Sequence, residues 1–179
     1  METGTIPHYL LQLCGAITKA LVLVVALPLT TAFLLTIPLP ATLLLITSTL
    51  VIEYGAAPIG IGLGLHPPFV LYVLVCVALG VTLLLFDVFD IMAEHSNRVS
   101  QFLKKSSDRG KQSSFLTKYG IYGLVPCVFT LGFYVCPPVS WVLGWRRDLS
   151  ILLIMAGYIA ISTVTILATI GIFLVSQVN

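Results

Sequence analysis

Charged residues are scarce in this chain. Only 9% of its 179 residues are Asp, Glu, Lys or Arg, whereas 58% are hydrophobic. A soluble domain carries about 25% charged residues, so too few are present here to cover a surface that faces water. We therefore expect an integral membrane protein, with the bilayer as the solvent for most of the chain. The basic residues behind the net charge of +2 form no patch interleaved with aromatic residues, so we predict no nucleic-acid partner.

Signatures of catalysis, metal binding and secretion are also missing. The cysteines form no Cys-x-x-Cys or Cys/His spacing, which favours buried free thiols over a zinc or redox site. These cysteines are Cys14, Cys76, Cys127 and Cys136. No paired-acid, HExxH or serine-nucleophile motif occurs, so we predict neither enzymatic activity nor a cofactor. The N-terminus has no basic region or convincing cleavage site, and no cleavable signal peptide is expected.

Apolar runs of spanning length occur three times. A transmembrane helix needs about 20 residues, and we place spans at 20–37, 68–86 and 149–175. Two further apolar segments, 41–66 and 119–145, are interrupted by glycine and proline. Each is too short for two spans and too broken for one regular helix.

The basic residues favour a topology in which both interrupted segments return to the side they entered from. If both crossed fully, Lys19, Arg146 and Arg147 would lie opposite the basic central loop, against the positive-inside rule. If both are re-entrant, all nine Lys and Arg residues lie inside. We therefore predict that the N-terminus and central loop are cytoplasmic and the C-terminus is outside. The sequence alone leaves both topologies open.

The two interrupted segments share a motif. Tyr54-Gly55-x-x-Pro58 is followed by eight residues and then Pro67-Pro68, whereas Tyr122-Gly123-x-x-Pro126 is followed by ten residues and then Pro137-Pro138. One re-entrant loop plus one span crosses the membrane an odd number of times, so two such units in series must be inverted, a recurring transporter plan. Chance is the alternative, because glycine, proline and tyrosine are frequent here.

These observations predict an all-α integral membrane fold. It is an inverted repeat of a re-entrant helical loop plus a transmembrane helix, with an extra N-terminal transmembrane helix. Residues 1–179 form a single membrane domain. Its parts are an N-terminal segment with the first span (1–40), repeat 1 (41–90), a cytoplasmic polar loop (91–114) and repeat 2 (115–179).

The stretch "EYGAAPIGIGLGL" resembles the first motif of the small multidrug export family, a branch of the DedA superfamily of membrane proteins. The matching residues are Glu53, Gly55, Pro58, Gly60 and Gly64. "KYGIYGLVPCVFTLGF" resembles the start of the second motif, and "WVLGWRRDLSILLIMAGYIAIS" the family's ending. The chain departs from the family in having "TLGFYVCPP" where a Pro-x-Pro-Gly-Thr-Gly-like stretch is usual, and no arginine in that loop. The resemblance implies two opposed re-entrant loops that move lipid carriers or small molecules across the membrane.

Glu53 is the main site candidate, because it is the only acidic residue between Glu2 and Asp87. An ionisable side chain inside the bilayer costs at least ~3 kcal/mol and normally faces a cavity. A carboxylate in such a cavity would suit proton coupling or binding of a cationic substrate. The alternative is that Glu53 lies at the outer rim of its loop, or hydrogen-bonds to N–H groups of that loop. The predicted substrate or proton site is Glu53, Tyr54, Gly55, Pro58, Tyr122, Gly123, Pro126 and Gly132.

Two charged groups near the ends of spans are weaker candidates. Arg146 and Arg147 could bind a lipid phosphate, with topological anchoring as the alternative. Asp87, Asp90 and Glu94 share a helical face and could ligate a cation. The simpler interpretation of these acids is a helix that continues to about residue 103, with an ion pair between Glu94 and Arg98 and no metal.

The predicted function is a transporter, flippase or scramblase. Its substrate would be a phospholipid, a polyprenyl phosphate or a small cationic molecule, with proton coupling as an option, and its site would lie between the two re-entrant loops. The alternative is a non-transporting structural or assembly protein. Membrane lipids are the expected partners, together with a second copy of the chain, because three spans make a thin bundle.

Overall fold

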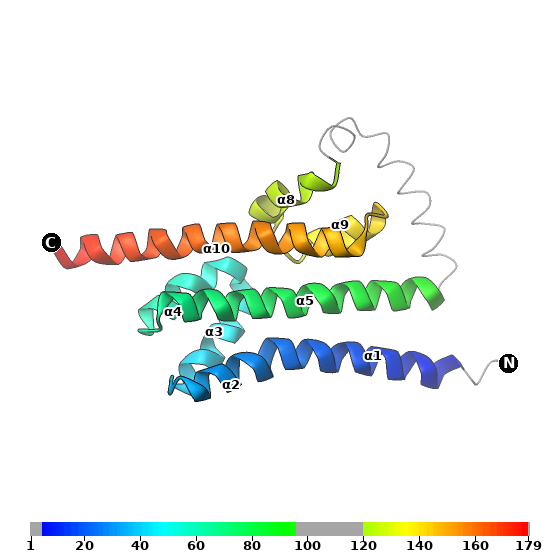
Figure 1. Ribbon diagram of the computed structural model, residues 1–179, viewed down its shortest axis with the longest axis horizontal. Helices are drawn as coiled ribbons and strands as arrows, with labels where there is room; N and C mark the ends of the chain where they lie inside the picture. The colour runs from blue at the N-terminus through cyan, green and yellow to red at the C-terminus, as the bar shows by residue number, and fades with distance from the viewer. Residues whose placement is uncertain (1–4, 96–119, 179) are drawn as a thin grey trace.

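All regular elements in the described part of the chain are helices. The computed structural model describes residues 5–95 and 120–178. Three long rods lie side by side with α5 in the middle (Figure 1). They are α1–η1–α2 (Thr5–Leu21, Val22–Ala26 and Leu27–Leu34), α5 (Pro67–His95) and α10 (Arg147–Val178).

Four helical stretches of the described residues are long and apolar enough to cross a membrane. They are Leu11–Leu34, Leu39–Gly62, Pro67–Met92 and Arg147–Phe173. Many large apolar side chains on the outside of these helices are exposed, as expected for surfaces that face lipid. The structure therefore agrees with an all-helical integral membrane protein.

The first rod begins well before the predicted span 20–37, and it continues through Pro28. A proline inside a helix lacks an N–H and its ring excludes the carbonyl four residues earlier. The π-helical turn Val22–Ala26 directly precedes this point and widens the backbone, so the helix passes Pro28 without ending. Gly80 of α5 packs against this turn, and a Cβ there would lie 2.6 Å from Val24 Cγ2. The missing side chain at Gly80 allows the two rods to approach closely.

The segment between the first two rods is bent. Helix α3 (Leu39–Ile52) leads through the 3₁₀ turn η2 (Glu53–Ala56) into the short helix α4 (Ala57–Gly62). Ile37 before α3 and His66 after α4 line the same cavity of about 560 Å³, so both ends of the segment lie at one end of the molecule (Figure 1). The 14 residues of α3 span about 21 Å at 1.5 Å per residue, less than the ~30 Å core of a bilayer.

A second bent segment lies toward the opposite end of the bundle, beside α10 (Figure 1). It consists of η3 (Gly120–Gly123), α8 (Leu124–Leu131) and α9 (Cys136–Val142), with a break at residues 132–135. Helix α8 packs closely on α10, where a Cβ at Gly157 would lie 3.3 Å from the Val125 carbonyl oxygen. The two bent segments, 39–62 and 120–142, agree well with the predicted interrupted segments 41–66 and 119–145.

The structure corrects the predicted positions of the breaks. Residues Ala57–Gly62 are helical, with Pro58 in the first turn of α4 where proline is tolerated, so the chain does not bend at this proline. The segment bends at the turn Glu53–Ala56 instead. Likewise, Tyr122 and Gly123 lie in the 3₁₀ turn η3 and Pro126 lies in the first turn of α8, before the break at 132–135. The two copies of the motif therefore occupy matching local places, each at a 3₁₀ turn that leads into a short helix. Each short helix is followed by a break and then by a helix whose first turn holds the Pro-Pro pair.

Candidate functional site: the crossing of the two bent segments

Glu53 ends α3 in a backbone conformation that is unusual for glutamate. Its φ is 57° and its ψ is −130°. A residue with a Cβ rarely adopts a positive φ, and such conformations cost about 1–3 kcal/mol unless the surroundings impose them. Contacts from another part of the chain hold Glu53 in this conformation.

Those contacts come from the break between α8 and α9. Glu53 Oε2 accepts the backbone N–H of Phe133 at 3.2 Å, across 80 residues of sequence. Gly132 lies directly beneath the carboxylate with φ 79°, and a Cβ at this position would collide with both carboxylate oxygens. Only glycine lets the Glu53 carboxylate lie this close to the second break.

The second segment returns a hydrogen bond to the first. The Tyr134 hydroxyl donates to the carbonyl oxygen of Leu50 at 2.6 Å. Leu50 belongs to the last turn of α3, where carbonyls have no partner within the helix. The two breaks therefore satisfy part of each other's backbone, at a contact that we call the crossing (Leu50, Glu53, Gly132, Phe133 and Tyr134).

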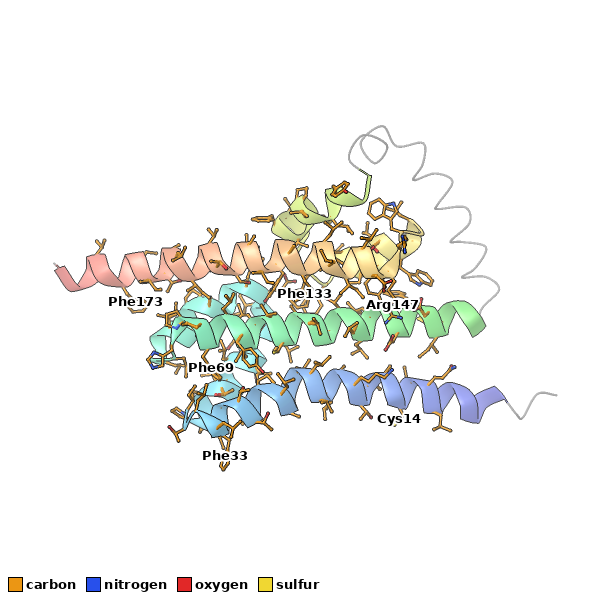
Figure 2. All side chains as sticks on the ribbon, viewed as in Figure 1. Cys14, Phe33, Phe69, Phe133, Arg147 and Phe173 are labelled. Carbon is orange, nitrogen blue, oxygen red and sulfur yellow. The ribbon has the colours of Figure 1, made fainter. Side chains whose placement is uncertain are left out.

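Aromatic rings and buried hydroxyls surround the crossing. Phe133 stacks on Tyr134 with ring centroids 4.3 Å apart and meets Tyr158 of α10 edge-on at 5.0 Å. Figure 2 shows Phe133 between α10 and α5. The hydroxyl groups of Tyr158 and of Ser162, one helical turn further along, are fully buried, and within the described part of the chain neither has a hydrogen-bond partner outside this pair. Buried polar atoms are nearly always paired in proteins, so these two hydroxyls could serve a polar group.

A second polar cluster joins α5 to the start of α10. Arg147 Nη2 lies 2.5 Å from Asp87 Oδ1, and Arg147 Nη1 lies 2.9 Å from Asp90 Oδ2. Trp141 of α9 donates its indole N–H to Asp90 Oδ1 at 2.9 Å. The Arg147 guanidinium also lies over the Phe86 ring, 5.7 Å from its centroid, and Figure 2 shows it at the beginning of α10. This cluster, the Arg147 cluster, ties the last third of the chain to α5.

No protein-family model, no curated protein and no solved structure matches this chain. The resemblance to the small multidrug export family stays a prediction.

The crossing contains two of the predicted site residues. Glu53 and Gly132 meet there, and Tyr54 and Gly55 follow in η2. Pro58 starts α4. The remaining predicted site residues lie at the start of α8, separated from the crossing by that helix; they are Tyr122, Gly123 and Pro126. Tyr122 is 72% exposed.

The crossing also contains residues that the sequence analysis missed. Phe133 and Tyr134 were not predicted, although an aromatic pair directly after the helix-breaking Gly132 was a usable signal. The own-loop alternative for Glu53 does not describe its contacts, because the carboxylate bonds to the other segment.

The weaker candidates pair with each other. Arg147, expected at a lipid phosphate, pairs with Asp87 and Asp90, expected at a cation. Arg146 is exposed. The side chain of Glu94, its pair with Arg98 and the helical continuation to residue 103 lie outside the described residues.

The cysteines are free thiols, as predicted, but they are not uniformly buried. Cys136 is fully buried, Cys76 and Cys127 are half-buried, and Cys14 is exposed. The expectation that all four are buried was wrong for Cys14, which faces outward from the first rod.

Proposed function

We propose that this protein is a transporter, flippase or scramblase whose substrate passes between two re-entrant helical loops, α3–η2–α4 and η3–α8–α9. The observation that carries the proposal is the reciprocal contact at the crossing, where Glu53 accepts from Phe133 and Tyr134 donates to Leu50. Broken backbone at membrane depth is tolerated where protein or a water-filled path satisfies its polar groups. Half-helices that approach from opposite ends and meet inside the bilayer are a recurring transporter plan.

The short helices support re-entrance over full crossing. The seven or eight residues of α9 and α8 span only about 10–12 Å each, far less than a bilayer core. Helices of this length can reach the interior only as pairs that enter and return. In this topology the N-terminus and the central loop are cytoplasmic, and the C-terminus is outside.

The chemistry of the crossing favours a substrate with a cationic group, or a lipid moved together with a proton. Glu53 has no basic partner among the described residues, so its carboxylate is available to a cation or a proton. The buried hydroxyls of Tyr158 and Ser162 offer hydrogen bonds nearby. The proposed substrates are therefore a phospholipid, a polyprenyl phosphate or a small cationic molecule.

The topology can be tested by cysteine labelling. His66→Cys and Arg146→Cys, each introduced into a cysteine-free chain, are treated with a membrane-impermeant maleimide in sealed vesicles. Re-entrance of both segments places positions 66 and 146 on opposite sides of the membrane. Labelling of both from the same side would refute re-entrance.

Activity can be tested in liposomes that contain a fluorescent phospholipid or polyprenyl phosphate, with and without a pH gradient. Glu53→Gln keeps an amide oxygen that can accept the Phe133 N–H, but it removes the charge. We expect a correctly folded variant with at least about a tenfold loss of transport rate. The matched control is Asp148→Asn, which removes an exposed carboxylate at the start of α10 and should leave the rate unchanged. Wild-type rates in Glu53→Gln would contradict a functional role for this carboxylate.

The alternative is a structural or assembly protein in which Glu53 serves only to pair a backbone N–H. The contact with Phe133 is the observation that favours it. In that case Glu53→Ala would destabilise the fold, Glu53→Gln would be silent, and the wild-type protein would move none of the tested lipids. The same set of variants therefore separates the two functions.

A further inference from the structure

A polar cavity of about 320 Å³ lies between α1, α5 and the start of α10, away from the crossing. Its polar walls are Gln12 and Lys19 of α1, Asp87 and Asp90 of α5, and Arg147 of α10. Gly15 forms part of the floor, and a Cβ there would meet no heavy atom within 4 Å. A volume of this size is at the lower end of the range for small-molecule sites.

Some of the polar groups in this cavity are already paired. Arg147 divides its guanidinium between Asp87 and Asp90, and the second oxygen of Asp90 accepts the Trp141 indole N–H. These interactions neutralise Arg147 and occupy both oxygens of Asp90. They leave one carboxylate oxygen of Asp87, its Oδ2, with no hydrogen bond to the described part of the chain.

Two other groups in the same cavity are uncommitted. The Gln12 side-chain oxygen is buried and has no hydrogen-bond partner in the part of the chain that the structure describes. Lys19 pairs with no carboxylate among residues 5–95 and 120–178. The cavity therefore presents two free acceptors, Asp87 Oδ2 and Gln12 Oε1, together with one free ammonium.

We infer that this cavity binds a small zwitterionic group that carries a primary ammonium and an oxyacid anion a few ångströms apart. The ammonium donates to Asp87 Oδ2 and Gln12 Oε1, and the anion lies against Lys19. A purely anionic group would leave both acceptors unpaired, and a purely cationic one would leave Lys19 unpaired. A quaternary ammonium has no N–H to donate, so it would not satisfy the Gln12 oxygen.

The position of the cavity favours a phospholipid head group as the source of this chemistry. Its residues lie at the start of the apolar stretches Leu11–Leu34 and Arg147–Phe173 and at the end of Pro67–Met92. Phospholipid head groups lie at this level, where the apolar stretches meet water. An ethanolamine phospholipid combines a primary ammonium with a phosphate, and free phosphoethanolamine offers the same two groups in water.

The test is lipid retention by the full-length protein in detergent, measured by native mass spectrometry. Phosphatidylethanolamine, phosphatidylcholine and phosphatidylglycerol with identical acyl chains are added in turn. We expect about tenfold or greater retention of phosphatidylethanolamine over the other two, the factor typical of a hydrogen bond to a charged group. Competition by free phosphoethanolamine would mean that the water-soluble compound is also a ligand, and no competition would mean that the lipid alone binds. Equal retention of all three lipids, or of none, would overturn the inference.

Two variants localise the binding without touching the Arg147 cluster. Gln12→Leu removes a free acceptor, and Lys19→Gln removes the free ammonium; each should lower phosphatidylethanolamine retention about tenfold. Asp148→Asn removes an exposed charge outside the cavity and should have no effect. Unchanged retention in both cavity variants would place the lipid elsewhere and refute the site. These measurements do not depend on the transport assay, because they record binding only.

Discussion

Replacing Gly132 by alanine should break the crossing. Two effects add, because the new Cβ meets an unfavourable backbone conformation and an occupied space. Gly132 has φ 79° and ψ 175°, in a region that is essentially restricted to glycine. The same Cβ would collide with the Glu53 carboxylate, which must then leave the Phe133 N–H.

The magnitude follows from these two contributions. A side chain in this backbone region costs about 1–3 kcal/mol. Losing a hydrogen bond to a charged group costs about 1.5–3 kcal/mol. The sum of roughly 2.5–6 kcal/mol should lower the midpoint of thermal unfolding by about 5–24 °C, given the 2–4 °C per kcal/mol expected for a chain of this size.

Thermal unfolding in detergent, followed by intrinsic fluorescence, measures this effect. The control is Gly62→Ala, because Gly62 lies in α4 at a position where a Cβ meets no atom within 4 Å. Glu53→Ala removes the colliding carboxylate, so the double variant with Gly132→Ala should lose less stability than the sum of the single variants. Wild-type stability of Gly132→Ala, or strict additivity in the double variant, would refute the contact.

Three other substitutions test separate contacts. Tyr134→Phe removes the hydroxyl that donates to Leu50 and should cost about 1 kcal/mol in thermal unfolding, with no effect expected if that carbonyl needs no partner. Arg147→Lys replaces the planar fork that reaches both carboxylates by a single ammonium. Because the ion pairs are partly exposed, the expected loss is only about 0.5–1 kcal/mol and should shrink in high salt. Gly80→Val should cost about 1–3 kcal/mol by forcing α5 away from the first rod. Gly171→Val, on an open face of α10, should cost almost nothing, and equal costs at the two glycines would contradict the close approach.

The positions of the long helices and of the two bent segments could be predicted from the sequence, because they depend on runs of apolar residues and on interruptions. The position of each break could not. Pro58 and Pro126 suggested breaks, but both lie in the first turn of a helix, where proline replaces an N–H that has no helical partner. The interruptions at Glu53 and Gly132 are set by a contact between them, which no local pattern records.

The pairing of Asp87 and Asp90 with Arg147 could not be predicted either, because it too is a contact between residues far apart in the sequence. Asp87 and Asp90 lie on one face of α5 by helical spacing alone, and this much was predicted. Their pairing with Arg147 depends on α9 returning to the end of α5, which is a property of the tertiary fold. The predicted cytoplasmic location of all three residues was compatible with this pairing and could have suggested it.

The crossing joins residues that are 80 and 84 positions apart in the chain. At a synthesis rate of about 5–20 residues per second, Phe133 leaves the ribosome roughly 4–16 s after Glu53. During that interval the first rod is already synthesised and α5 follows, but the end of α3 and the carboxylate of Glu53 have no second segment to pair with. Biogenesis therefore includes a stage at which the incomplete protein has an unpaired Glu53 carboxylate and an unpaired end of α3. Retention of the first segment near the insertion machinery, or binding of a chaperone, would protect these groups until the second segment is synthesised.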